Sequence, residues 1–193
     1  MSKILVKNNR LEWGGKAYVC AIGKGGFSKD KKEGDGATPI GTFALRECWY
    51  RADRLAMPQT ELPLHIIHEN DGWCDDPKST DYNKHILIPP PVGGRLGGGH
   101  TCSAEQIMPP PQPSPYGGGS YERLWRDEHV YDLIVPLGYN DESPVPGKGS
   151  AIFLHLAKPG YPGTEGCVAL ALADLLDVLK LCGSGTVIDI QDK

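Results

Sequence analysis

Two residues near the C-terminal end of the chain, His155 and Cys167, have the types and the spacing of a base and a nucleophile. His155 interrupts an apolar run at residues 151–157, and Cys167 follows a loop rich in proline and glycine. An imidazole that removes the proton of a thiol produces a thiolate, which attacks carbonyl carbon and forms a covalent intermediate. The pair therefore predicts acyl transfer or hydrolysis at a cysteine.

Each of these two residues also has a simpler interpretation. Free cysteine is among the most buried residue types, and a histidine in a strand is commonly a hydrogen-bonded core residue. The glycine before Cys167, and a loop flexible enough to fold the cysteine onto the histidine strand, favour chemistry over that interpretation.

The signals for strand, turn and helix around the pair indicate how it is positioned. Residues 151–157 are apolar on both alternating faces, which is typical of a strand buried on two sides. Residues 170–182 have apolar side chains at helical spacing, and Gly183 ends that pattern. Cys167 is thus predicted to lie between a glycine turn and a helix start. Backbone N–H groups of Gly166 and Cys167 would there lower the pKa of the thiol and later hold an oxyanion.

Two motifs resemble the L,D-transpeptidase (YkuD-like) catalytic domain family. One is the strand histidine followed by Thr164, Glu165, Gly166 and Cys167, and the other is the upstream segment DGATPIGTF at residues 35–43. The resemblance covers about residues 19–190, apart from an insertion. It implies a β-rich α+β domain, with a mixed β-sheet or sandwich and a helix after the catalytic cysteine. It also implies that Cys167 is the nucleophile and His155 the base, with Thr164 and Gly166 in the loop that holds the oxyanion.

The same resemblance implies a peptidoglycan L,D-transpeptidase that needs no cofactor. Cys167 would form a thioester with the third residue of a donor stem tetrapeptide and release D-alanine. An amine of an acceptor stem would then take the acyl group, giving a 3,3 or a 1,3 crosslink. Water in place of the amine would make the same site an L,D-carboxypeptidase or amidase. Carbapenem β-lactams are the implied inhibitors, and the bacterial cell envelope is the implied location.

The chain departs from the family pattern at two positions beside the nucleophile. Glu165 stands where many members have histidine, and Ala169 stands where many have arginine or asparagine. The nucleophile and the base are unaffected. The departures concern the recognition of the substrate, because a basic residue at position 169 would otherwise contact a substrate carboxylate.

Further candidates for substrate binding come from polar turns. Residues 70–83 are predicted to form a polar loop anchored by Trp73, in which Asp75 or Asp76 would meet a substrate amine. The alternative is that Asp76 merely makes a turn with the proline that follows it. Tyr139 and Asn140, in the turn after a predicted strand, complete the candidates.

Two functions of other classes stay open at this stage. His65 and His68 have His-x-x-His spacing and would need Cys74 or further ligands to hold zinc. Residues three apart on a strand point to opposite faces, so no metal site is expected. A catalytically inactive peptidoglycan-binding module would keep the fold, although it would have no need of both His155 and Cys167.

Composition favours a single domain spanning residues 1–193. A chain of 193 residues can bury one core, and its 25 glycines and 17 prolines indicate many turns and short strands. The formal net charge of −4 gives no reason to expect nucleic acid as a partner, and no apolar run reaches the ~18 residues of a membrane span. The six cysteines are widely spaced and predict no disulfide framework, and we expect a monomer.

The first ten residues bear on location. They contain only three apolar residues in a row, too few for the apolar stretch of a secretory signal. This disagrees with the envelope location that the family implies, so a cytoplasmic location stays open at this stage.

Other elements are predicted along the chain. Strands are expected as a hairpin of two at residues 4–6 and 10–21, and then at residues 40–49, 64–68, 130–137 and 185–190. Residues 23–36 are predicted to be a surface turn, and residues 120–125 a short helix capped by Ser120. Residues 88–119 contain two proline clusters and two glycine clusters and are predicted to be an inserted loop.

Overall fold

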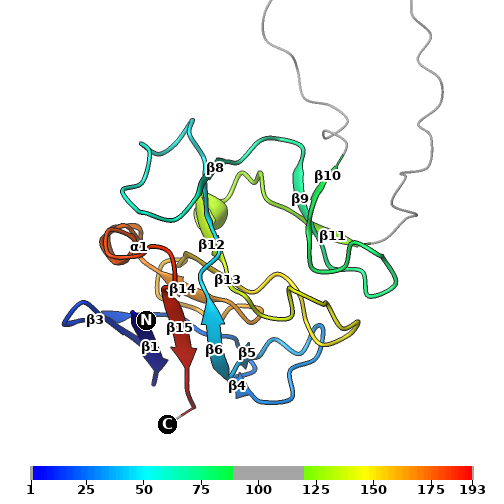
Figure 1. Ribbon diagram of the computed structural model, residues 1–193, viewed down its shortest axis with the longest axis horizontal. Helices are drawn as coiled ribbons and strands as arrows, with labels where there is room; N and C mark the ends of the chain where they lie inside the picture. The colour runs from blue at the N-terminus through cyan, green and yellow to red at the C-terminus, as the bar shows by residue number, and fades with distance from the viewer. Residues whose placement is uncertain (1, 89–119, 193) are drawn as a thin grey trace, which may run out of the picture.

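The computed structural model describes residues 2–88 and 120–192 (Figure 1). The insertion predicted at 88–119 lies, apart from Ile88, outside the described residues. The described chain forms two five-stranded sheets, a three-stranded sheet and a two-stranded sheet, with one α-helix. The prediction of a β-rich α+β fold is confirmed.

The first five-stranded sheet joins the two ends of the described chain, in the order β3-β2-β1-β15-β6. Its strands are β1 (Lys3–Lys7), β2 (Arg10–Trp13), β3 (Lys16–Val19), β6 (Gly41–Ala44) and β15 (Val187–Ile190). β1 and β15 are parallel, and the other neighbours are antiparallel. The predicted two-stranded hairpin is wrong, because Gly14 and Gly15 adopt positive φ and turn the chain into a third strand.

The second five-stranded sheet has the order β14-β13-β12-β7-β8. Its strands are β7 (Cys48–Tyr50), β8 (Leu64–Ile66), β12 (Leu133–Pro136), β13 (Phe153–Leu156) and β14 (Val168–Leu170). The strand predicted at 40–49 is divided between the two sheets, since β6 pairs with β15 and β7 pairs with β12. The strands predicted at 64–68, 130–137, 151–157 and 185–190 are confirmed in shorter form.

Two smaller sheets contain segments that were predicted otherwise. The three-stranded sheet places β9 (Asp71–Cys74) between β10 (His85–Leu87) and β11 (Tyr121–Arg123). The predicted polar loop 70–83 therefore begins with a buried strand, and the helix predicted at 120–125 is wrong. Backbone pairing of β11 with β9 outweighs the local helix signal, and the 3₁₀ helix η1 (His129–Tyr131) follows instead. The two-stranded sheet pairs β4 (Phe27–Ser28) with β5 (Thr38–Pro39) in parallel.

The main core lies between the two five-stranded sheets. Leu154 and Leu156 of β13 contribute to it from one side, and Ile188 and Ile190 of β15 from the other. The helix α1 (Leu172–Leu179) closes this core with its buried Leu175, Val178 and Leu179. The helix predicted at 170–182 is thus confirmed in shorter form, with its apolar face inward as the spacing requires.

The opposite face of the second sheet packs against a smaller cluster. Alternate residues of its strands, Trp49, Ile134 and Phe153, point to this side, because successive side chains of a strand face opposite ways. Trp73 of β9 and Leu124, the residue after β11, cover them. In Figure 1 the sheet of β9, β10 and β11 accordingly lies on the far side of β12 and β13 from β1. His155, two residues after Phe153, belongs to the same face.

Asn83 ties this second face together. Its backbone is left-handed, with φ of 58°, and its side chain is buried. Its Oδ1 accepts hydrogen bonds from Trp73 Nε1 and Ala151 N, both at 3.0 Å, and its Nδ2 donates to the carbonyls of Tyr139 and Asn140. A single amide thus connects three segments that are distant in sequence.

We predict that Asn83→Ala destabilises the protein by about 2–4 kcal/mol, since it leaves several buried polar groups without partners. Asn8→Ala is the matched control, because Asn8 also has positive φ but is exposed. Denaturant unfolding of both variants separates backbone strain, which they share, from the hydrogen bonds, which only Asn83 makes. An equal loss in the two variants would contradict the structural role given to the Asn83 amide.

Candidate active site

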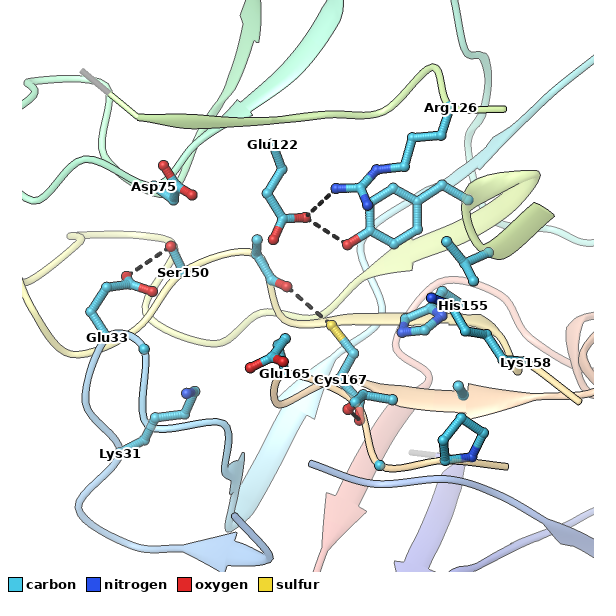
Figure 2. Close-up of a pocket in the computed structure, with 18 residues that line it drawn as sticks. Lys31, Glu33, Asp75, Glu122, Arg126, Ser150, His155, Lys158, Glu165 and Cys167 are labelled. Atoms are coloured by element: carbon cyan, nitrogen blue, oxygen red, sulfur yellow. Dashed lines mark hydrogen bonds and ion pairs between the residues drawn. The ribbon is translucent and has the colours of Figure 1, made fainter. Parts of the chain in front are cut away.

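Cys167 and His155 line one cavity of about 520 Å³ (Figure 2). Its wall comes from the loop after β4, from the residue after β9, from β11 and the segment that follows it, and from the residues around β13 and β14. These segments are spread over most of the chain. They meet on the face of the second five-stranded sheet to which Phe153 and His155 point.

His155 is held on β13 as a neutral base. Its register partners are Ile134 on β12 and Ala169 on β14, so it lies in the middle of the sheet. Its Nδ1 lies 2.9 Å from the carbonyl oxygen of Leu156, which can only accept, so Nδ1 carries the hydrogen and Nε2 carries the lone pair. Burial lowers the pKa of His155 to about 4. The imidazole is therefore uncharged at neutral pH and ready to take a proton at Nε2.

The Tyr131 ring packs edge-on against the His155 ring, at 5.5 Å between centroids. Tyr131 is itself held by its hydroxyl, which donates to Glu122 Oε2 at 2.6 Å. The guanidinium of Arg126 lies 4.4 Å above the Tyr131 ring and 3.6 Å from Glu122. The orientation of the histidine thus depends on a buried aromatic ring as well as on the Leu156 carbonyl.

Cys167 is a buried thiol in this structure. Its Sγ–H donates to the carbonyl of Ala151 at 3.2 Å, and the Phe153 N–H donates to Sγ at 3.4 Å. Burial, with the negative charge of Glu122 as a smaller cause, raises the pKa of Cys167 to about 12. The expected lowering of this pKa is wrong. Cys167 is followed by the strand β14 and not by a helix start, so no helix N-terminus faces the sulfur.

Neither of these hydrogen bonds of the Cys167 sulfur is to His155, although both residues line the same cavity. The described pair is a neutral thiol beside a neutral imidazole. The raised pKa of the thiol and the lowered pKa of the imidazole favour removal of the thiol proton at the moment of attack, rather than a stored thiolate.

The loop before the nucleophile is shaped by Gly166 and Thr164. Gly166 has φ of 132°, and a Cβ there would lie 2.8 Å from the carbonyl oxygen of Ala37. Only glycine fits this position. Thr164 Oγ1 accepts from Gly166 N at 3.1 Å and donates to the Cys167 carbonyl at 2.7 Å. The N–H of Gly166 is therefore occupied by Thr164, which counts against the expectation that it serves as an oxyanion donor.

The contact between Gly166 and Ala37 joins the two sequence motifs. Ala37 belongs to the upstream segment, where Asp35 accepts from Ala37 N at 2.9 Å and pairs with Lys31 Nζ at 2.6 Å. Lys31 is buried and lines the cavity together with Glu33. The prediction that residues 23–36 are only a surface turn is wrong. The available signal was the Lys31 and Asp35 pair just before the Thr-Pro motif.

The predicted site residues divide into two groups. Thr164, Glu165 and Asp75 line the cavity with Cys167 and His155. Glu165 is exposed and pairs with Lys24 at 2.6 Å. Glu122 and Arg126 also line the cavity, and sequence reasoning missed them because their segment carries a helix signal.

The remaining candidates have structural roles and do not line the cavity. Trp73 is buried edge-on against Phe153, at 5.1 Å between ring centroids. Asp76 Oδ1 accepts from Lys78 N at 3.0 Å, which confirms the turn alternative for this residue. The Tyr139 hydroxyl donates to the carbonyl of Lys148 at 2.5 Å, and the Asn140 side chain holds the loop at 145–149.

His65, one histidine of the zinc hypothesis, has other partners. His65 Nε2 lies 2.9 Å from Glu47, and its ring stacks on Trp49 at 4.6 Å. Among the described residues, no group of three or more His, Cys, Asp or Glu side chains could hold a metal ion. The same described part of the chain contains no helix long and apolar enough to cross a membrane.

A family model, the L,D-transpeptidase catalytic domain, matches residues 2–190 of the chain. The match covers nearly the whole length, so the chain belongs to this family. No curated protein and no solved structure matches the chain at a significant level. The family model therefore adds to the site geometry without naming a particular relative.

We predict that alkylation of Cys167 by iodoacetamide accelerates by about tenfold for each unit of pH between 7 and 10. The thiolate is the reactive form, and its fraction rises about tenfold per pH unit as long as the pH is below the raised pKa of the thiol. Cys182 is the internal control: burial raises its pKa to about 12 as well, but it does not line the cavity. Peptide mapping should show faster labelling at Cys167 at every pH. A rate that is already constant from pH 6 to 8 would reveal a stored thiolate and contradict the neutral pair.

Proposed function

We propose that the protein is a cysteine-dependent peptidoglycan L,D-transpeptidase. The observation that carries the proposal is the cavity that Cys167 and His155 both line, with the imidazole hydrogen held at Nδ1 by the Leu156 carbonyl. Membership of the L,D-transpeptidase catalytic domain family supports it.

In the first half of the reaction, Nε2 of His155 takes the proton of the Cys167 thiol while the sulfur attacks the carbonyl of the third residue of a donor stem tetrapeptide. A C–S bond forms and the carbonyl oxygen becomes an oxyanion, which we assign to the N–H of Cys167. When the oxyanion collapses, the C–N bond to D-alanine breaks, and the imidazolium returns its proton to the leaving amine.

In the second half, a neutral amine of an acceptor stem attacks the thioester. A C–N bond forms and the C–S bond breaks, and His155 passes the proton of the amine to the departing sulfur. A side-chain amine of a third residue gives a 3,3 crosslink, and a first-residue amine gives a 1,3 crosslink. Water at the same step gives carboxypeptidase products. Because stem peptides lie in the bacterial cell envelope, we propose that the protein acts there.

Incubation with purified muropeptides, followed by mass spectrometry, tests this function. We expect release of D-alanine and a crosslinked product from the wild-type protein, and a loss of at least about a thousandfold in Cys167→Ala, since that variant lacks the nucleophile. Cys20→Ala is the matched control, because Cys20 is buried in the main core away from the cavity. Turnover by a folded Cys167→Ala protein would sink the mechanism.

A carbapenem should acylate Cys167, since its strained lactam offers the same electrophile as the stem peptide. Intact-protein mass spectrometry with peptide mapping should place one adduct at Cys167 in the wild-type and Cys20→Ala proteins. His155→Ala should slow acylation by about a hundredfold at neutral pH, and higher pH should restore part of the rate because the thiol then ionises unaided. An adduct on another residue would count directly against Cys167 as the nucleophile.

A further inference from the structure

Acidic side chains gather on one side of Cys167 in the cavity. Figure 2 shows Glu33, Asp75 and Glu122 on the side of Ser150, with Lys31 near Glu33. Lys158 lies on the side of His155, and the side chain of Arg126 reaches to Glu122. The three carboxylates come from three separate elements: the loop after β4, the residue after β9, and β11. Tertiary packing alone brings them together.

Two of the three carboxylates, Glu33 and Asp75, form no ion pair with any residue that the structure describes. Glu33 accepts hydrogen bonds from the neutral hydroxyls of Tyr82 and of Ser150, the latter at 2.8 Å. Asp75 Oδ1 is buried and has no hydrogen-bond partner. Neither residue has an ion-pair partner in the described part of the chain, and Lys31 on the same side is already paired with Asp35.

The pKa of Glu122, the third carboxylate, is affected by the charges of the other two. Burial raises the pKa of Glu122, and the negative charges of Asp75 and Glu33 raise it further, whereas Tyr131 and Arg126 lower it. Arg126 is 3.6 Å away and compensates Glu122 only in part. An acceptor oxygen buried without a partner costs free energy, and a cation that donates a hydrogen bond to it removes that cost and also offsets the negative charge of the three carboxylates.

An alkylammonium group matches this arrangement. It carries one positive charge and three N–H donors that can point to three acceptors at once. A neutral hydroxyl or amide would satisfy the Asp75 oxygen but not the negative charge. An anionic group would be repelled from this side.

We propose that Glu33, Asp75 and Glu122 form a subsite that binds an ammonium group of the stem peptide beside Cys167. This inference rests on the proposed function and names the recognition that the function needs. The ammonium group has two possible sources with the same chemistry. One is the acceptor amine, which binds in its protonated form and passes one proton to a carboxylate of the subsite before it attacks as a neutral amine. The other is the side-chain amine of the third residue of the donor.

Asp75→Asn is the decisive variant. It removes the negative charge and keeps the shape of the side chain. No hydrogen bond to the buried oxygen is lost, because that oxygen has no partner. Asp76→Asn is the matched control, because it removes the same charge one residue away, outside the cavity. Its Oδ1 can still accept from Lys78 N, so the turn is preserved.

The binding arm needs no turnover. Full-length Cys167→Ala protein, alone and combined with Asp75→Asn or Asp76→Asn, is titrated with pentylamine at neutral pH and followed by NMR, with 1-pentanol as the uncharged probe. We expect Asp75→Asn to raise the Kd for pentylamine by about tenfold, the factor for one charge-assisted hydrogen bond. The Asp76→Asn variant and the 1-pentanol titrations should show no change. No binding of pentylamine, or the same Kd in all three proteins, overturns the subsite.

The reaction arm uses proteins that retain Cys167 and identifies the source of the ammonium group. D-alanine release is measured in the first turnover, because later turnovers must wait for the acceptor to resolve the thioester. If Asp75→Asn slows crosslinking about tenfold and leaves the first-turnover release of D-alanine unchanged, the subsite binds the acceptor; if that release slows as well, it binds the donor. Unchanged rates of both steps would overturn a role in the reaction. Failure of the wild-type protein to form any acyl-enzyme would refute the proposed function, while the binding arm would still decide the subsite.

Discussion

The alternation of side chains along β13 is the constraint on which the site depends. Leu154 and Leu156 point into the core between the two large sheets, so Phe153 and His155 must point the other way. A shift of one residue in the register would bury the histidine in the main core and place leucines in the cavity. Pairing on both sides, with β12 and β14, opposes that shift.

Cys167 differs from three other buried cysteines in its position, and not in the ionisation of its thiol. Burial raises the pKa of Cys20, Cys48, Cys167 and Cys182 alike, each to about 12. Of these four, Cys167 lines the cavity together with a histidine whose free nitrogen is a base. A neutral pair of this kind avoids the cost of burying two charges until a substrate is present, because desolvation penalises both the thiolate and the imidazolium.

Some polar residues near the site support its structure, and others line the cavity. Trp73, Tyr139 and Asn140 all donate or accept hydrogen bonds with the buried amide of Asn83. A loop that runs under a cavity has backbone groups that water cannot reach, so side chains must satisfy them. Asp75, in contrast, has a buried oxygen that no other residue satisfies. Residue type alone does not separate these two roles.

The sequence by itself determined the nucleophile and base as candidates, the family, the β-rich fold class, and the positions of β13, α1 and β15, because these depend on short motifs and on local periodicity. The single domain over residues 1–193 stays a prediction. Tertiary structure alone decided that residues 121–123 form a strand, that Lys31 is buried, and that Glu33, Asp75 and Glu122 share one wall. It also decided that the pKa of Cys167 is raised and not lowered. Burial and the meeting of distant segments depend on how the sheets pack, and no local pattern of residues records that packing.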